Sequence, residues 1–160
     1  MSALKMIAIG RKLANIYAGL STPICRKYGI NQTCFDVLLF CANNPQNNTA
    51  RDICAIRGIK SGIASVAVET LISGGYMRRE NDSTDRRIRR LVPTEKAAPI
   101  IAEGRDMQSR FAVMLRSGIT QEELASFERM TDKLEENIRL FEQAERSPVS
   151  ARDSAPALRA

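Results

Sequence analysis

The sequence "RRENDSTDRRIRRL", residues 78–91, contains six arginines around a short run of turn-forming residues. Three acidic residues, Glu80, Asp82 and Asp85, lie among them. Asn, Asp and Ser between two strand-like runs, "YMRRE" and "IRRLV", predict a β-hairpin. Asp82 and Asp85 can offset the repulsion between the arginines and hold the turn through Asx-type hydrogen bonds to the backbone. The stretch therefore predicts a basic two-stranded hairpin, which needs a larger body to fold on.

The residues before the hairpin predict two helices joined by a tight turn. Thr49 and Asp52 form a capping-box pattern that opens a short helix, and Gly58 ends it. A second helix runs from about Lys60 to Ser73, and its apolar residues at helical spacing are Ala64, Ala67, Val68 and Leu71. Two helices with a Gly-containing turn, followed by a two-stranded hairpin, are the order of a winged helix-turn-helix.

Longer helices are predicted on both sides of this unit. Residues 3–20 carry a helical apolar stripe that Pro23 is expected to end, and Asn31 is a candidate N-cap for the next helix. After the hairpin, Thr94 is expected to cap a helix that reaches about Arg116. Pro99 lies near the fifth position of that helix, so a local kink or a lost hydrogen bond is expected.

The last helix begins at a capping box of Thr120 and Glu123. Its apolar residues follow a spacing of three and four, which is typical of a helix that pairs with a partner helix. The residues expected at a dimer interface are Leu124, Phe127, Leu134, Ile138 and Phe141. The same spacing also fits an amphipathic helix packed on its own domain. Residues 147–160 are rich in Ser, Ala and Pro and are expected to be disordered.

The distribution of charge favours a polyanionic partner on one part of the chain. The chain has 160 residues and a net charge of +6. Residues 1–30 hold five basic residues and no acid, residues 51–96 hold ten basic residues against six acids, and residues 120–146 hold four against eight. A basic middle beside an acidic final helix indicates nucleic acid on one face and another partner elsewhere. No apolar run approaches the length of a membrane span.

The cysteines and the absence of histidine argue against a metal site and against an enzyme. Cys25, Cys34, Cys41 and Cys54 form no C-x-x-C pair, and the sequence has no histidine. A zinc site is therefore not expected, and neither a Ser/His/Asp nor a Cys/His arrangement can be built. No cofactor is expected. These cysteines are expected to be buried, reduced thiols.

The segment "ARDICAIRGIKSGIASVAVETLISGGYMRRENDSTDRRIRRLVPTEKA", residues 50–97, resembles the core of the MarR family of transcription regulators. Asp85-Arg86-Arg87 followed by "IRRLVPTEKA" is similar to the wing motif of that family, Asp-x-Arg leading into Leu-Thr. Gly75-Tyr76 and the flanking helices extend the resemblance to roughly residues 5–145. Pro93 and Ala97 depart from the family pattern, where Leu and Gly are usual, at the exit from the wing.

The resemblance implies a mainly α fold with a small β-hairpin wing (α+β), built as a winged helix-turn-helix core with long N- and C-terminal dimerisation helices. Residues 1–146 are expected to form a single MarR-like domain. Within it, residues 30–93 would be the DNA-binding lobe, and residues 1–22 and 94–146 the dimerisation lobe. The implied protein is a cytoplasmic, homodimeric repressor that binds a pseudo-palindromic operator in double-stranded DNA and is released by a small aromatic or anionic ligand.

The resemblance also implies site residues. The second helix of the pair would enter the major groove with its N-terminal half and the wing would reach the minor groove. The expected DNA-binding residues are Lys60, Ser61, Gly62, Ser65, Arg78, Arg79, Asp85, Arg86 and Arg87. Asp85 would orient the loop while Arg87 enters the groove. Val66 stands where many relatives carry a longer polar residue, which implies modest base readout. A ligand pocket is expected, from position alone, at Arg11, Ile16, Tyr17, Phe35 and Phe111.

Two alternatives remain open at this point. The first is a thiol-based redox sensor of the same fold, in which Arg26 and Lys27 lower the pKa of Cys25. The second is a winged-helix protein-interaction module that does not bind DNA, although such a hairpin would not need an excess of arginine.

Overall fold

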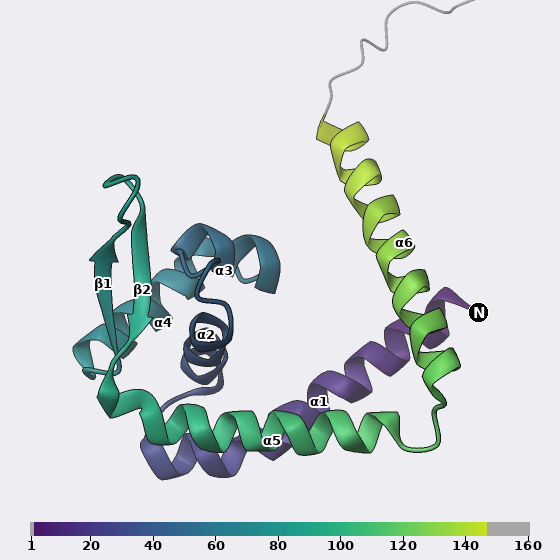
Figure 1. Cartoon of the computed structure of the whole chain (residues 1–160), viewed down its shortest axis with the longest axis horizontal. Helices are drawn as coiled ribbons and strands as arrows, with labels where there is room; N and C mark the ends of the chain where they lie inside the picture. The colour runs from purple at the N-terminus through teal and green to yellow at the C-terminus, as the bar shows by residue number, and fades with distance from the viewer. Residues whose placement is uncertain (1, 147–160) are drawn as a thin grey trace, which may run out of the picture. The chain divides into compact units, whose positions relative to one another are not determined.

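The computed structural model describes residues 2–146, and the chain divides after Leu115 into two compact units. The first unit holds four helices, a two-stranded sheet and most of a fifth helix, α5 (Figure 1). The second unit holds the last helix, α6. The prediction of a mainly helical chain with one small antiparallel hairpin is confirmed. Residues 147–160, for which disorder was expected, lie outside the described residues.

The first helix, α1, spans Ala3–Tyr28, so the predicted end at Pro23 is wrong. Proline removes one N–H donor and crowds the carbonyl of the residue four positions earlier, here Gly19. The helix nevertheless continues past Pro23 to Tyr28, and its C-cap is Gly29, whose φ of 65° is left-handed.

Helix α2, Gln32–Asn43, is the centre of the first unit. Asn31 caps it as predicted, with its side-chain oxygen accepting from the Cys34 backbone N–H at 2.8 Å. Its buried residues make up a large part of the hydrophobic core and are Cys34, Phe35, Val37, Leu38, Leu39, Phe40 and Cys41. Helix α5 packs closely on it, because a Cβ on Gly104 would lie 2.6 Å from a methyl of Leu39.

The predicted helix pair is present as α3, Ala50–Arg57, and α4, Ser61–Ser73. Both bonds of the Thr49–Asp52 capping box form, and Gly58 ends α3 with a φ of 64°. The four apolar residues predicted to share one face of α4, from Ala64 to Leu71, are all buried. The capping residues therefore set both ends of α3, and the spacing of the apolar residues sets the inner face of α4.

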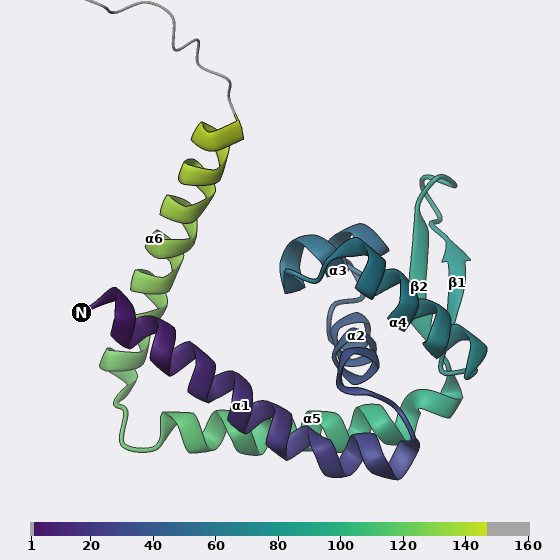
Figure 2. The ribbon, with the colours of Figure 1, turned by 180° about the vertical axis from the view of Figure 1, so that it is seen from behind.

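Strands β1, Met77–Asn81, and β2, Arg89–Pro93, pair antiparallel, with Arg79 opposite Leu91. Met77 and Leu91 are buried, which fixes the hairpin to the core. The backbone N–H of Leu91 also donates to the carbonyl of Asn48 at 2.9 Å, in the loop before α3. The hairpin stands beside the helix pair, and its tip points away from α5 (Figure 2).

The chain after the hairpin differs from the prediction in one turn. A 3-10 turn, η1 (Glu95–Ala97), precedes α5 (Ala98–Arg116). Thr94 does not cap the helix, because its hydroxyl donates to the Gly75 carbonyl at 2.6 Å. Pro99 is consequently the second residue of α5, in the first turn where a missing N–H breaks no helical bond, and the expected kink is not required there.

Helix α6, Gln121–Arg146, begins where the sequence predicts. Glu123 accepts from the Thr120 backbone N–H at 2.8 Å, and the Thr120 hydroxyl accepts from the Glu123 N–H at 3.2 Å. This reciprocal pair is the predicted capping box. Within residues 2–146, none of the helices combines the length and the apolar character that crossing a membrane requires.

Candidate nucleic-acid interface

Helix α4 presents its N-terminal half to solvent. Lys60 is the N-cap residue, and it is exposed together with Ser61, Gly62 and Ser65. Gly62 and Ser65 lie off the buried face of the helix, and Lys60 and Ser61 lie at its exposed first turn. A helix N-terminus with exposed backbone N–H groups and short side chains allows close approach of an anionic surface. The structure therefore places the predicted major-groove residues together on one exposed helix end.

Asp82 organises the loop at the tip of the hairpin. Its Oδ1 accepts from the backbone N–H of Thr84 at 2.8 Å and of Asp85 at 3.1 Å, and its Oδ2 accepts from the Arg90 guanidinium at 2.7 Å. The Thr84 N–H, then Arg90, then the Asp85 N–H lower the pKa of the Asp82 carboxyl to about 2. The carboxylate is thus charged whenever the loop is formed at neutral pH.

Asp85 forms a second, smaller turn of the same kind. Its Oδ1 accepts from the backbone N–H of Arg87 at 2.9 Å. The predicted Asx-type hydrogen bonds of both aspartates are therefore confirmed, but Asp82 makes most of them. Sequence reasoning assigned the orienting role to Asp85 and left Asp82 out of the site.

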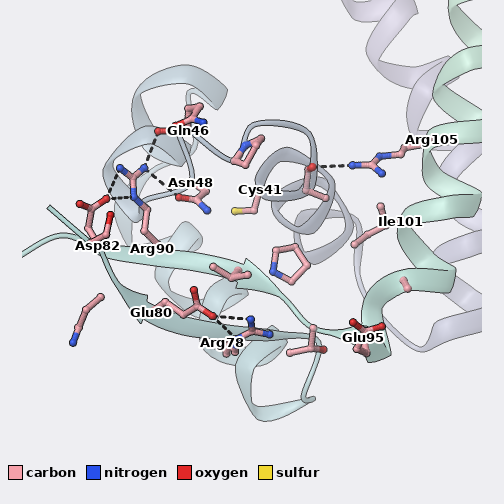
Figure 3. A pocket seen from close by; sticks show the side chains of 18 of the residues that line it. Cys41, Gln46, Asn48, Arg78, Glu80, Asp82, Arg90, Glu95, Ile101 and Arg105 are labelled. Carbon is pink, nitrogen blue, oxygen red and sulfur yellow. Dashed lines mark hydrogen bonds and ion pairs between the residues drawn. The ribbon is translucent and has the colours of Figure 1, made fainter. Parts of the chain in front are cut away.

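Arg90 ties the hairpin to the rest of the unit (Figure 3). Besides the Asp82 carboxylate, its guanidinium donates to the Gln46 carbonyl at 2.7 Å and to the Asn48 side-chain oxygen at 3.3 Å. Asn48 is itself buried. The sequence analysis missed this role, because both loop partners lie more than forty residues away in the chain. No local sequence signal could have found it.

Three other arginines of the hairpin are also engaged within the protein. Arg78 pairs with Glu80 on the same strand at 2.6 Å. Arg79 pairs with Glu69 of α4, and Arg89 donates to the side-chain oxygen of Asn81 across the hairpin. Together with Arg90, these residues are called the tethered arginines.

Arg86 and Arg87 differ from the tethered arginines. Both are exposed at the loop, and within the described residues their side chains form no hydrogen bond or ion pair. They are called the tip arginines. An exposed guanidinium with no internal partner keeps all its donors for an outside acceptor such as a phosphate.

The residues expected to form a ligand pocket are not brought together. Tyr17 and Phe111 contact each other edge to face at 5.7 Å, and the Tyr17 hydroxyl accepts from Gln108 at 2.8 Å. Phe35 is fully buried in the core, whereas Arg11 and Ile16 are exposed. None of the five lines the open cavity of about 770 Å³ between the hairpin, the end of α2 and the start of α5.

The arginine side chains on the wall of that cavity are already bonded to groups of the protein (Figure 3). Arg78 and Arg90, on its wall, bind Glu80 and Asp82. Arg105 donates to the Asn43 side chain at 2.9 Å and to the Ala42 carbonyl at 2.8 Å, at the end of α2. The guanidinium groups there thus stabilise the fold around the cavity.

The residues expected at a dimer interface share one face of α6 by their helical spacing. Phe127, Ile138 and Phe141 are 56%, 60% and 67% exposed, while Leu124 and Leu134 are half-buried. Large aromatic and aliphatic side chains at that exposure are typical of a surface that a partner covers.

The cysteines are free thiols, and Cys25, Cys34 and Cys41 are buried. Burial raises the pKa of the Cys25 thiol, and the Asp36 carboxylate raises it further. Arg26 and Lys27 are not among the groups that shift its pKa, so the lowering proposed for a redox sensor is not found. Among residues 2–146, no group of three or more Cys, Asp and Glu side chains could hold a metal ion.

Residues 28–88, which include the whole of α2, α3 and α4 and the loop of the hairpin, match the family model of the MarR family. The match contains the exposed end of α4, both loop aspartates and both tip arginines.

Solved structures with the same fold include several regulators. A MarR family regulator from Listeria monocytogenes, in complex with a 26mer DNA, aligns with a TM-score of 0.71 and 20% identity over 86% of this chain and 89% of its own. The transcription regulator MarR from Oenococcus oeni aligns with a TM-score of 0.67 and 18% identity over 84% and 99%. A MarR from Staphylococcus aureus, in complex with salicylate and kanamycin, aligns with a TM-score of 0.63 and 22% identity over 85% and 91%.

Proposed function

This chain belongs to the MarR family of DNA-binding transcription regulators, and we propose that it acts as a homodimeric repressor that a small ligand releases from its operator. Residues 30–93 form the DNA-binding lobe in this proposal. Residues 1–22 and 94–146 form the dimerisation lobe. The site of action is the cytoplasm.

The observation that carries the proposal is the exposed pair of tip arginines on an internally braced hairpin. Asp82 and Arg90 hold the loop, so Arg86 and Arg87 can reach a phosphate or the minor groove without first losing an internal partner. Lys60 and the short residues after it lie at the end of α4 that enters the major groove in this proposal. Arg78 and Arg79 add positive charge to the same lobe, although each must share its guanidinium with a glutamate.

Exposed apolar residues support the homodimer. In α6 they are Phe127, Ile138 and Phe141. In the first unit, α1 separately exposes large apolar residues along its first two-thirds, at Leu4, Met6, Ile7, Ile9, Ile16 and Leu20. Burying such side chains against a second copy gives roughly 25 cal/mol per Å² of apolar surface.

A ligand of aromatic or anionic character is proposed by analogy with the staphylococcal relative, whose structure contains salicylate. The proposed pocket residues are Arg11, Ile16, Tyr17, Phe35 and Phe111. Of these residues, Tyr17 and Phe111 contact each other and could form one aromatic wall of the pocket.

The test is a selection of bound duplexes from a random DNA pool, followed by sedimentation of the protein alone and on the selected duplex. We expect a dimer on a pseudo-palindrome whose half-sites lie about 10 bp apart, one turn of the helix. A folded protein that enriches no duplex would instead support a protein-interaction module. Adding salicylate to the complex tests release by a ligand of the proposed class.

The dimer is tested by Leu134→Asp, which places a charge in the apolar face of α6. We expect loss of the dimer and of operator binding together. Lys133→Asp is the matched control, because it adds the same acid at a neighbouring exposed position outside the stripe. A Leu134→Asp protein that remains dimeric and binds normally would show that α6 is not the interface.

A further inference from the structure

The outward face of α4 carries apolar side chains that neither the core nor the helix itself covers. Val66 is 67% exposed and Ile63 is 52% exposed. The buried residues Ala64, Ala67 and Val68 define the inner face, and Val66 projects nearly opposite them by helical spacing. Gly62 lies one turn before Val66, and no atom lies within 4 Å of a Cβ built on it. A surface that approaches this helix end therefore meets the methyl groups of Val66 beside bare backbone.

The polar groups near these apolar residues offer few long-reaching contacts. Ser61 and Ser65 have short side chains, and the Thr70 hydroxyl donates back to the carbonyl of Val66 at 2.8 Å. Glu69 is paired with Arg79. Apart from Lys60, the exposed first turns of α4 thus recognise a partner by close fit and apolar contact.

The basic residues of this unit indicate which class of partner α4 binds. Lys60 starts the helix, and the two tip arginines extend from the hairpin of the same unit without internal partners. An apolar patch with basic residues around it fits a polyanion that also displays apolar groups. The major groove of DNA has this chemistry, because thymine places its C5-methyl group there and no other base does. A shallow cavity of about 340 Å³ beside Val66 gives room for such a group, and its lining residues are Asn31, Thr33, Gly62, Ile63, Val66 and Ala67.

We propose that Val66, with Ile63 beside it, reads the C5-methyl group of a thymine in each operator half-site. This inference rests on the proposed DNA binding and adds the base to which α4 responds. Val66 is then a specificity-determining residue, although it has no hydrogen-bonding group in its side chain. In this proposal the base is read by burial of a methyl group against a methyl group.

The test removes the methyl group from the DNA and leaves the base pair intact. In the selected duplex, each thymine is replaced in turn by 2′-deoxyuridine, which keeps the O4 acceptor and the pairing with adenine. At one position in each half-site we expect a replacement to lower the affinity about fourfold, which is the effect of burying one methyl group. Replacing that thymine in both half-sites should lower the affinity about fifteenfold. Replacements in the flanking sequence serve as the control.

The matching protein variant is Val66→Ala, which shortens a largely exposed side chain and does not touch the core. It should bind the thymine duplex more weakly and should distinguish thymine from deoxyuridine less well than wild type. Thr70→Ala is the control, because threonine has nearly the shape of valine and lies one turn further along the same helix. It should retain the wild-type ratio of the two affinities.

The outcomes separate this inference from the function on which it rests. A position whose deoxyuridine effect is smaller in Val66→Ala than in wild type supports the methyl contact, and an effect that stays the same in this variant overturns it. A duplex that is bound with the same affinity after every replacement overturns it while DNA binding stands, and the apolar face of α4 then has another occupant. Failure to bind any duplex overturns both.

Discussion

The tethered arginines and the tip arginines lie within thirteen residues of one another and carry the same charge, yet they differ in what surrounds them. Arg78, Arg79, Arg89 and Arg90 each bind an oxygen of the protein. Arg86 and Arg87 bind none among the described residues. Six arginines in a hairpin therefore do not mean six contacts to DNA. Most of them build the hairpin, and two are left to act outside it.

The largest expected effect comes from removing the residue that connects the two groups. Asp82→Ala deletes the acceptor for two loop N–H groups and for Arg90, so the loop loses its shape and Arg90 loses its carboxylate partner. Both tip arginines would then be misaligned on each protomer. We expect operator affinity to fall about a hundredfold, the loss of one contact of ~1.4 kcal/mol per protomer, as measured by titration of labelled operator.

Charge counting predicts the opposite sign for Asp82→Ala, since the variant is more basic. An unchanged or tighter complex would show that the braced hairpin is not needed for binding. Circular dichroism of the variant serves as the control, because the helices should keep their content.

The second prediction compares the loss of a tip arginine with the loss of a tethered arginine. Arg87→Ala removes one free guanidinium per protomer, so we expect affinity to fall about thirtyfold and the slope of log affinity against log salt to flatten by about two for the dimer. Arg78→Ala removes the same side chain from an exposed ion pair, whose loss changes little, and we expect less than about a threefold change. Equal salt slopes for the two variants would remove the distinction between the groups.

Asp85→Ala should have a smaller effect than Asp82→Ala, because Asp85 holds only the Arg87 N–H. We expect operator binding to weaken about tenfold, or ~1.4 kcal/mol. The measurement is the same titration, with wild type and Asp82→Ala alongside. A gain in affinity would mean that Asp85 only dilutes the positive charge.

The smallest effect concerns pH. The pKa of Asp82 is lowered to about 2, so its contribution to loop stability is complete above the ordinary carboxyl range and is lost as pH falls toward 2. The Thr84 amide resonance should therefore stay constant from pH 7 to about 5 and then titrate with a midpoint near the lowered pKa. A midpoint at the ordinary value, about 3.9, would show that the bonds to Asp82 do not persist in solution.

The sequence predicted those features that depend on near neighbours in the chain. The caps at Asn31, Thr49 and Thr120, the end of α3 at Gly58 and the Asx turns of the loop all follow from residues a few positions apart. Both partners of each interaction lie in one short stretch of sequence, so the local pattern was enough to predict them.

The sequence did not predict features that depend on distant packing. Pro23 reads as a helix end, but α1 continues through it to Tyr28. Thr94 reads as a cap, yet its hydroxyl turns to Gly75, which only the hairpin brings close. Arg90 was given no role of its own from the sequence, because its partners at Gln46 and Asn48 become neighbours only in the folded unit.

The bonds from Arg90 and Leu91 to the loop at residues 46–48 have a consequence for the order in which the chain folds. A two-stranded hairpin is marginal alone, and these bonds close a loop of more than forty residues whose entropy must be lost before they form. Helices α2, α3 and α4 rely on contacts nearer in sequence and can collapse without it. We expect the hairpin to consolidate after the folding transition state, so its substitutions should speed unfolding and leave the folding rate nearly unchanged. The segment that contacts DNA in the proposed function would then be the last to assemble and the first to open.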